Sequence, residues 1–309
     1  MTFKKSKHKK PQNIKKSILI TGATGYLGSK LAHALVNRNE YEIIILKRKS
    51  SNTFRISELL GKIKMYDLDM TPLEDIFLEN KIDTVLHCAT DYGRKDVNPL
   101  QVIEANLLLP VRLLEFGRKH DIRCFINTDT ILDKRINHYS LSKRHFNDWL
   151  MSYRKNVLCI NVALEHFYGP GDDTTKFASF VVHSLLKKVD KIDLTAGEQK
   201  RDFIFIHDVV SAFLRIIDYS STLRKDFYEF QIGGSEPVTI KEFVLMIKRL
   251  TGNTTTILNF GALPYREDEI MECRIDVEPI KKLGWKTMYS LEEGLKLMIE
   301  QEVVYTVSS

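Results

Sequence analysis

A glycine-rich turn near the N-terminus constrains the fold of this chain more than any other feature. It directly follows the short apolar run 17–20, and a helical stretch that ends at Arg38 follows it. Glycine lets a backbone turn tightly from strand to helix and approach a phosphate group, whose charge the first N–H groups of the helix favour. We therefore expect a dinucleotide pyrophosphate to bind at Gly22, Thr24, Gly25, Tyr26, Leu27 and Gly28. The alternative is a glycine turn that serves only the packing of strand against helix.

Short β-branched runs alternate with helical stretches through the first half of the 309 residues. We expect strands at 18–20, 42–46, 63–67, 84–88, 123–127 and 157–162, and helices at 25–38, 73–80, 98–120 and 138–153. This alternation requires right-handed crossovers, which predicts an α/β fold with a doubly wound parallel sheet of the Rossmann type. Pro99 suits the first turn of its helix, whereas Pro110 must kink or divide it.

The alternation weakens after Gly169-Pro170-Gly171. We expect a helix at 177–188, strands at 191–194, 203–206 and 227–232, and helices that begin at Asp208, Thr239 and Ser290. Glu242 and Glu293 give the last two helices the spacing of a capping box. The pattern predicts a dinucleotide-binding domain over 17–165, to which 203–232 return, and a smaller C-terminal substrate-binding lobe over 166–202 and 233–309.

The net charge of +6 belongs to the N-terminus, because residues 1–17 contain seven lysines and no acidic residue. Without them, 39 basic residues remain against 40 acidic ones. Residues 1–16 are therefore expected to be a basic, disordered tail, the alternative being a contact with nucleic acid or an anionic surface. We expect no nucleic-acid partner and no membrane partner, since no apolar stretch is long enough to span a membrane, and a cytoplasmic location, since no secretory signal is present.

Four cysteines, Cys88, Cys124, Cys159 and Cys273, are widely separated along the chain. They lack the paired spacing of a zinc site, and three of them lie in apolar, strand-like runs. We expect buried free thiols, no disulfide and no metal site.

Basic residues follow the second predicted strand, where an NAD-binding protein usually offers a carboxylate to the ribose 2′-hydroxyl. Here the chain has Lys47 and Arg48, which would attract a 2′-phosphate. The pattern favours NADPH as the cofactor, with NADH possible, over an ordinary basic surface loop. Asp67 and Leu68, at the end of the third strand, are expected to border the adenine.

Tyr139 and Lys143 are four residues apart, which places them on one face of a helix. A phenol has a pKa near 10, so we expect the nearby ammonium to lower the pKa of Tyr139 and allow proton transfer at neutral pH. Thr128 ends a strand and offers a hydroxyl to a substrate oxygen, and Asn106 would complete a proton relay. A Tyr-x-x-x-Lys pair is often only a surface feature, but with a nucleotide-binding turn in the same chain the catalytic interpretation is favoured.

Together these motifs resemble the extended short-chain dehydrogenase/reductase family, whose members act on nucleotide-linked sugars. The resemblance covers nearly the whole chain after the tail, including Tyr168-Gly169-Pro170-Gly171 and the run 201–208. It implies that Cys88, Ala89 and Thr90 contact the cofactor and that helices 98–120 and 138–153 form a homodimer.

Within the family, the segments 91–93, 127–130, 142–146 and 197–205 are similar to CDP-abequose and CDP-paratose synthases. This similarity implies NADPH-dependent reduction of the carbon-4 ketone of a CDP-linked deoxyhexose for bacterial O-antigen sugars. In such a reaction the cofactor would give hydride to the carbonyl carbon and Tyr139 a proton to its oxygen. The alternatives are a nucleotide-sugar 4-epimerase with tightly bound NAD and, more distantly, a non-catalytic nicotinamide-binding regulator.

Substrate contacts are expected from Asp129 and Thr130, beside Thr128, and from Arg201 and Arg266, whose guanidinium groups can clamp phosphate oxygens. Arg201 matches the family position for that task, the alternative being a surface salt bridge.

Departures from the family pattern also carry information. The 4,6-dehydratases of the family have Glu where this chain has Thr130, so elimination of water is not expected. An arginine that usually precedes the Tyr-Gly-Pro motif is replaced by Ala163, followed by Glu165 and His166. We expect His166 and His207 to be structural histidines.

Overall fold

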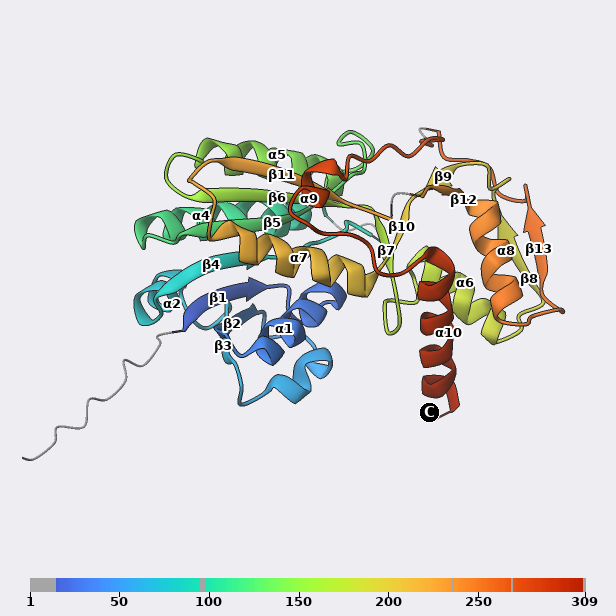
Figure 1. The fold of residues 1–309 in the computed structure, drawn as a ribbon, viewed down its shortest axis with the longest axis horizontal. Helices are drawn as coiled ribbons and strands as arrows, with labels where there is room; N and C mark the ends of the chain where they lie inside the picture. The colour runs from blue at the N-terminus through green and yellow to red at the C-terminus, as the bar shows by residue number, and fades with distance from the viewer. Residues whose placement is uncertain (1–14, 95–97, 235, 268, 308–309) are drawn as a thin grey trace, which may run out of the picture.

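The computed structural model describes residues 15–94, 98–234, 236–267 and 269–307. Within them, seven parallel strands form the main sheet, in the order β11-β6-β5-β4-β1-β2-β3 (Figure 1). The strands are β1 (Lys16–Thr21), β2 (Tyr41–Lys47), β3 (Lys64–Asp67), β4 (Ile82–His87), β5 (Cys124–Thr130), β6 (Leu158–Leu164) and β11 (Phe227–Ile232). The strand order reverses between β1 and β4, which opens a crevice at their carboxyl ends. The predicted doubly wound sheet is confirmed.

Helices cover both faces of this sheet, as the alternation of strand and helix requires. The helices of the first domain are α1 (Tyr26–Arg38), η1 (Phe54–Leu59), α2 (Leu73–Glu79), α5 (His138–Ser152) and α7 (Ile206–Ser220), with the divided helix described next. Ile18 and Ile20 pack with α1 and α7, whereas Leu19 between them packs with α2, α4 and α5. Successive side chains of β1 thus enter opposite cores, which explains why this strand is apolar along its whole length.

The predicted helix at 98–120 is divided into three segments: α3 (Pro99–Ile103), the π-helical turn η2 (Glu104–Leu108) and α4 (Leu109–Lys119). Pro99 lies in the first turn of α3, where a missing N–H costs no hydrogen bond, whereas Pro110 directly follows the π-helical turn inside a continuous helical stretch. The wide turn between them buries Asn106 completely.

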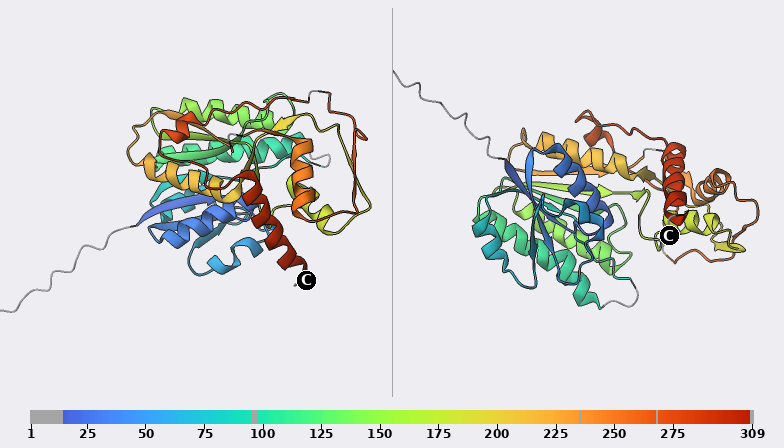
Figure 2. Two further views of the ribbon diagram at one scale, coloured as in Figure 1. Left: turned by 45° about the vertical axis from the view of Figure 1, so that its right-hand side comes forward. Right: turned by 90° about the horizontal axis from the view of Figure 1, so that it is seen from below.

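The C-terminal lobe lies at one end of the sheet, beyond α10, in all three views (Figures 1 and 2). Its elements, with those that connect it to the sheet, are β7 (His166–Tyr168), α6 (Phe177–Leu186), β8 (Lys191–Leu194), β9 (Lys200–Arg201), β10 (Phe203–Phe205), β12 (Val238–Thr239), α8 (Ile240–Leu250), β13 (Ile257–Phe260), α9 (Glu278–Lys281) and α10 (Leu291–Val307). After the first part of the lobe, the chain returns to the sheet, where β11 pairs with β6. The predicted basic tail, residues 1–16, lies outside the described residues as far as residue 14.

Both predicted capping boxes are present. The Thr239 hydroxyl accepts the Glu242 N–H, and the Glu242 carboxylate accepts the Thr239 N–H. Ser290 and Glu293 exchange the same pair of hydrogen bonds at the start of α10. The helix expected from Asp208 begins two residues earlier, at Ile206.

The cysteines are free, as predicted. Cys124 and Cys159 are buried, but Cys88 and Cys273 are partly exposed, so the expectation of burial was wrong for these two. Of the helices that the structure describes, none has both the length and the apolar character needed to cross a membrane.

Candidate active site

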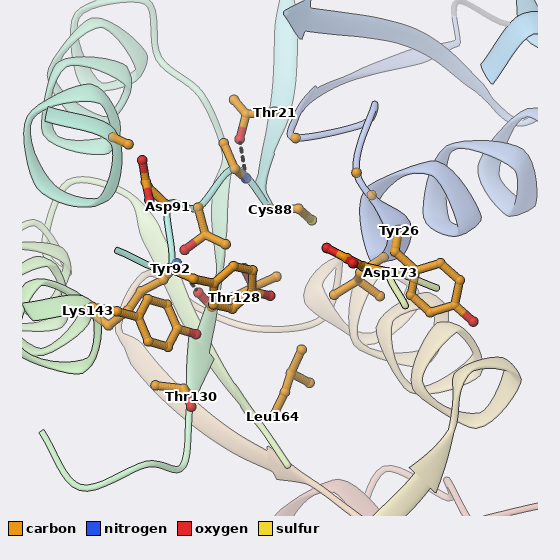
Figure 3. Close-up of a pocket in the computed structure, with 18 of the residues that line it drawn as sticks. Thr21, Tyr26, Cys88, Asp91, Tyr92, Thr128, Thr130, Lys143, Leu164 and Asp173 are labelled. Carbon is orange, nitrogen blue, oxygen red and sulfur yellow. Dashed lines mark hydrogen bonds between the residues drawn. The ribbon is translucent and has the colours of Figure 1, made fainter. Parts of the chain in front are cut away.

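A cleft of about 1440 Å³ opens at the carboxyl ends of the strands and brings the predicted motifs together (Figure 3). The predicted site residues that line it are Gly22, Thr24, Gly25, Tyr26, Leu27, Gly28, Lys47, Arg48, Leu68, Cys88, Ala89, Thr90, Thr128, Asp129, Thr130, Tyr139, Lys143 and Arg266. Three others, Asp67, Asn106 and Arg201, are not among the lining residues. Thr128, Thr130 and Lys143 lie on one side of the cleft, and Tyr26 lies on the other (Figure 3).

The glycine turn has the geometry of a phosphate cradle. Gly22 has a φ of +70°, and a Cβ there would lie 2.5 Å from the Ala89 nitrogen. A Cβ on Gly28 would lie 2.2 Å from the Gly22 oxygen, so only glycine fits either position. Gly25 precedes α1 without a capping side chain, which leaves the first N–H groups of this helix free to bind an anion. These residues fit a dinucleotide pyrophosphate.

Tyr139 and Lys143 come from the first two turns of α5, which begins at a capping box formed by Asn137 and Ser140. Burial raises the pKa of the Tyr139 phenol well above its ordinary value, and the neighbouring Tyr92 and Asp129 raise it further. A hydrogen bond with the Thr130 side chain opposes this rise in pKa. The phenol therefore keeps its proton at pH 7, as a tyrosine of ordinary pKa also does, and its burial makes it a weaker acid.

Lys143 lies at the bottom of the site, 1% exposed, and its Nζ donates to the Thr128 backbone oxygen at 2.9 Å. Burial lowers the pKa of Lys143 to about 8. The sequence predicted that this ammonium lowers the pKa of Tyr139. The structure corrects that expectation, because burial dominates the pKa of the phenol and Lys143 bonds to the strand instead.

A family model described as "NAD dependent epimerase/dehydratase family" matches residues 18–233, which include the glycine turn, Thr128, Tyr139 and Lys143. The chain belongs to this family. It is thus an NAD(P)-dependent enzyme of the extended short-chain dehydrogenase/reductase type, as the motifs predicted.

Similar proteins cover most of this chain. A CDP-abequose synthase of Salmonella muenchen is 34% identical over 299 residues, covering 94% of this chain and 99% of that protein. A CDP-abequose synthase of Yersinia pseudotuberculosis is 28% identical over 266 residues, covering 82% of this chain and 90% of that protein. The crystal structure of a UDP-glucose 4-epimerase from Thermotoga maritima, with UDP-glucose, superposes with a TM-score of 0.80 at 23% identity over 94% of this chain and 99% of that chain. This last likeness concerns the fold.

Lys47, the last residue of β2, and Arg48, which follows it, have different surroundings in the cleft. Lys47 Nζ lies 3.2 Å from Asp67 Oδ2, so the carboxylate partly neutralises this lysine. Arg48 and Arg55 both line the cleft, and the Arg55 guanidinium donates to the Gly171 oxygen at 2.7 Å. Asp67 thus pairs with Lys47, and Leu68 remains as the predicted adenine neighbour.

Asn106 fixes the loop that follows β4 through hydrogen bonds to the backbone of Asp91. Its Oδ1 accepts the Asp91 N–H at 2.7 Å, and its Nδ2 donates to the Asp91 oxygen at 2.8 Å and to the Ser142 hydroxyl at 3.0 Å. These hydrogen bonds give Asn106 a positioning role, and the proton relay stays a prediction. Thr128 also uses its hydroxyl within the protein, donating to the His87 oxygen at 3.1 Å, and must rotate to reach a substrate.

Asp129 is engaged by the protein, although it lies in the cleft wall. Its Oδ1 accepts from Lys134 Nζ at 2.7 Å, and its Oδ2 accepts from Asn161 Nδ2 at 3.0 Å. With 1% of its side chain exposed, this carboxylate is held away from a substrate. The hydroxyl of the next residue, Thr130, interacts with the phenol of Tyr139.

The two arginines predicted to bind phosphate have different positions. Arg266 lines the cleft. Arg201 does not, because its guanidinium forms an ion pair with Glu269 and donates to the Ile270 oxygen at 2.6 Å. Arg201 forms the kind of salt bridge that was the alternative, with a partner 68 residues away in the sequence, and phosphate binding by Arg201 stays a prediction.

Sequence reasoning missed several residues of the cleft. Tyr92 lies in the segment 91–93 but was given no role. Arg94 adds a positive charge, and Lys176 pairs with Asp172 at 3.1 Å. His166, expected to be structural, lines the cleft, with its Nδ1 2.7 Å from Glu165 Oε2. The replacement of the usual family residues before Phe167 was the signal that pointed to this position.

Proposed function

We propose that this protein reduces the 4-keto group of a nucleotide-linked deoxyhexose with NADPH, for bacterial surface-polysaccharide sugars. The observation that carries the proposal is the position of Tyr139 in the wall of the cleft together with Thr130, which stands where dehydratases have a carboxylate. Asp129 beside it is already paired with Lys134. Because Thr130 stands where the dehydratases have glutamate and Asp129 is paired with Lys134, the acid and base used for elimination are not both present at these positions, which favours reduction. The similarity to CDP-abequose synthases supports a CDP-linked substrate.

Each residue has one task in this proposal. Tyr139 gives its proton to the ketone oxygen, and Thr128 orients that oxygen after its hydroxyl turns from the His87 carbonyl. Lys143 holds the cofactor ribose and the end of β5. Arg266 binds the diphosphate of the substrate. The bound nicotinamide supplies the hydride.

Cofactor choice depends on Arg48. Arg48 follows β2 and lines the cleft, where its guanidinium would attract a 2′-phosphate, and Arg55 is a second cation that lines the same cleft. Both features support NADPH over NADH.

The test follows the absorbance of NADPH at 340 nm with CDP-, dTDP- and GDP-linked 4-keto deoxyhexoses. We expect oxidation with the CDP-linked sugar and an alcohol as product. Tyr139→Phe is the matched control, since it removes one hydroxyl: turnover should fall by about 10²–10⁴-fold while NADPH still binds. Constant absorbance with all three substrates would refute the proposal.

A 4-epimerase with tightly bound NAD is the second candidate. The ion pair between Lys47 and Asp67 favours it, because it removes one cation from the region of the 2′-phosphate. NAD retained on the purified protein, together with sugar interconversion in the absence of added reductant, would establish this alternative.

We also propose a homodimer formed by the divided helix and α5, which pack side by side. Their surfaces expose Leu100, Leu108, Leu141 and Trp149. Trp149→Glu is expected to give a monomer in light scattering, whereas Leu245→Glu, which changes an exposed apolar residue of the lobe, should leave the dimer intact. Wild-type protein that is monomeric at micromolar concentration would exclude this dimer.

A further inference from the structure

The last helix of the chain, α10, provides a buried carboxylate to which the proposed reaction gives no task. None of the residues of α10 that the structure describes lines the cleft. Glu302 of this helix is 4% exposed, and its Oε1 accepts the N–H of Gly171 at 2.7 Å. Its other oxygen lies 3.3 Å from His183 Nε2 on α6. Gly171 belongs to the loop between β7 and α6, whose next residues, Asp172 and Asp173, line the cleft, so Glu302 holds a segment of the cleft wall.

Gly171 is held at both of its backbone polar groups. Its N–H donates to Glu302, and its oxygen accepts from the Arg55 guanidinium at 2.7 Å. Gly171 has a φ of +76°, a conformation that glycine adopts readily, and it has no side chain with which to fix that conformation. The two hydrogen bonds meet at this one residue. A movement of the Glu302 carboxylate therefore displaces the oxygen that holds Arg55.

Arg55 belongs to η1 and lines the same cleft as the glycine turn. Its guanidinium carbon lies 5.8 Å from the ring centroid of Tyr26, the first residue of α1. The dipole and the free N–H groups at this end of α1 favour an anion. Among the residues that the structure describes, no carboxylate forms an ion pair with Arg55, and the bond to Gly171 uses one nitrogen of its guanidinium. The remaining N–H groups can bind a phosphate oxygen of the dinucleotide.

The affinity of an arginine for an anion depends on how firmly the side chain is held. A mobile arginine loses conformational freedom when it binds a ligand, and this loss weakens the binding. Here the Gly171 oxygen and the Phe54 ring, 4.8 Å from the guanidinium carbon, restrict Arg55 to one position. Because Glu302 holds Gly171, the carboxylate of α10 contributes to cofactor affinity without touching the cofactor.

We propose that Glu302 is a positioning residue for the dinucleotide, acting through Gly171 to hold Arg55 against a phosphate group of the cofactor. The inference goes beyond the proposed ketone reduction, because it concerns the binding of NADP⁺ or NAD⁺ and not the sugar. It also assigns the C-terminal helix a task in the dinucleotide site, to which it contributes no lining residue among those described.

The test measures the dissociation constants of NADP⁺ and NAD⁺ by isothermal titration calorimetry, without sugar. Arg55→Met should weaken the binding of NADP⁺ about 10- to 100-fold, the loss expected for a hydrogen bond to a charged group. Glu302→Met removes the acceptor of the Gly171 N–H and should weaken binding about 3- to 10-fold, the effect of freeing one side chain. Glu302→Gln keeps an oxygen for this N–H and should bind the cofactor as the wild type does.

The double variant separates positioning from a general loss of structure. If Glu302 acts through Arg55, adding Glu302→Met to Arg55→Met should change the dissociation constant by less than about twofold. Losses that multiply would show that the two residues act independently, and would overturn the inference. Equal losses for NADP⁺ and NAD⁺ in Arg55→Met would support a contact with the pyrophosphate, and a loss for NADP⁺ alone would support one with the 2′-phosphate.

Hydrogen exchange gives a second measurement that needs no change at Glu302, in case the methionine variant does not fold. Coupling between two sites is reciprocal, so NADP⁺ should slow exchange in the part of α10 around Glu302 in the wild type. It should not do so in Arg55→Met. Equal slowing in both proteins, or none in the wild type, would overturn the inference.

Glu292→Met is the matched control, because Glu292 is another carboxylate of α10 and forms an ion pair with Arg249 at 2.8 Å. It should leave both dissociation constants unchanged, and the thermal midpoint will check that each variant is folded. A loss of affinity as large as that in Glu302→Met would assign the effect to a loosened helix and overturn the role of Glu302. Any of these failures leaves the proposed ketone reduction standing if NADPH is still oxidised with a ketosugar. Wild-type protein that binds neither dinucleotide would refute both.

Discussion

Replacing Lys143 by methionine is expected to make the protein more stable at neutral pH while it abolishes activity. The lysine is charged at pH 7 although it is buried, and burial lowers its pKa from 10.5 to about 8. At about 1.4 kcal/mol for each pKa unit, this difference amounts to about 3 kcal/mol of folding free energy. Methionine also loses the hydrogen bond to the Thr128 oxygen, which costs about 1–2 kcal/mol. The net expectation at pH 7 is a gain of about 1–2 kcal/mol.

The sign of the pH dependence follows from proton binding. Between about pH 8 and 10.5 the unfolded chain keeps the proton of Lys143, whereas the folded protein releases it. Raising the pH through this window therefore stabilises the wild type relative to the variant by about 3 kcal/mol in total. The order of stability should reverse, so that Lys143→Met is less stable than the wild type near pH 10.

Urea unfolding at pH 7 and pH 10, followed by the fluorescence of the buried Trp285, measures both free energies. Using the difference between variant and wild type cancels the other groups that titrate in the same range. A variant that is less stable at pH 7, by an amount that does not change with pH, would refute the reasoning. In that case Lys143 would be uncharged in the folded protein or well solvated.

Three further predictions follow from single contacts. Arg48→Ser should raise the KM for NADPH about tenfold and leave that for NADH unchanged in steady-state assays; equal changes for both cofactors would exclude a 2′-phosphate contact. Glu269→Gln and Arg201→Met should raise the KM for the nucleotide sugar to similar extents, because the ion pair holds the segment that carries Arg266; an effect of Arg201→Met alone would instead indicate direct phosphate binding. Asn106→Ala should lower the free energy of unfolding by about 1–3 kcal/mol, since the Asp91 backbone loses its partners, and an unchanged thermal midpoint would contradict this.

Much of the first domain could be predicted from the sequence, because its signals are local. The glycine turn, the run of strands and the two capping boxes each depend on residues a few positions apart, and the structure places them as expected. β13 was not predicted, since it has only four residues, which alternate between exposed and half-buried and include no fully buried side chain. It exists because β8 offers an edge on which it can pair.

The candidate site, like the fold, could be predicted from the sequence where its signals are local and not where they depend on tertiary contacts. The sequence indicated which residues line the cleft, but not the residues with which they form ion pairs. Lys47 forms an ion pair with Asp67 on the neighbouring strand, and Arg201 forms one with Glu269 in a loop that is distant in the sequence. Such pairings depend on tertiary contacts. The effect of burial on Tyr139 and Lys143 was missed for the same reason, because spacing along a helix gives the distance between two groups but not their access to water.

The return of β11 to the sheet has a consequence for synthesis on the ribosome. The outer edge of β6 stays without its neighbour until residues 227–232 emerge, after the segment that contributes α6 and β8 has already been made. An unpaired edge of this kind invites pairing with other chains. Nascent chains arrested near residue 202 should therefore depend on chaperones, and fragments that end there should aggregate.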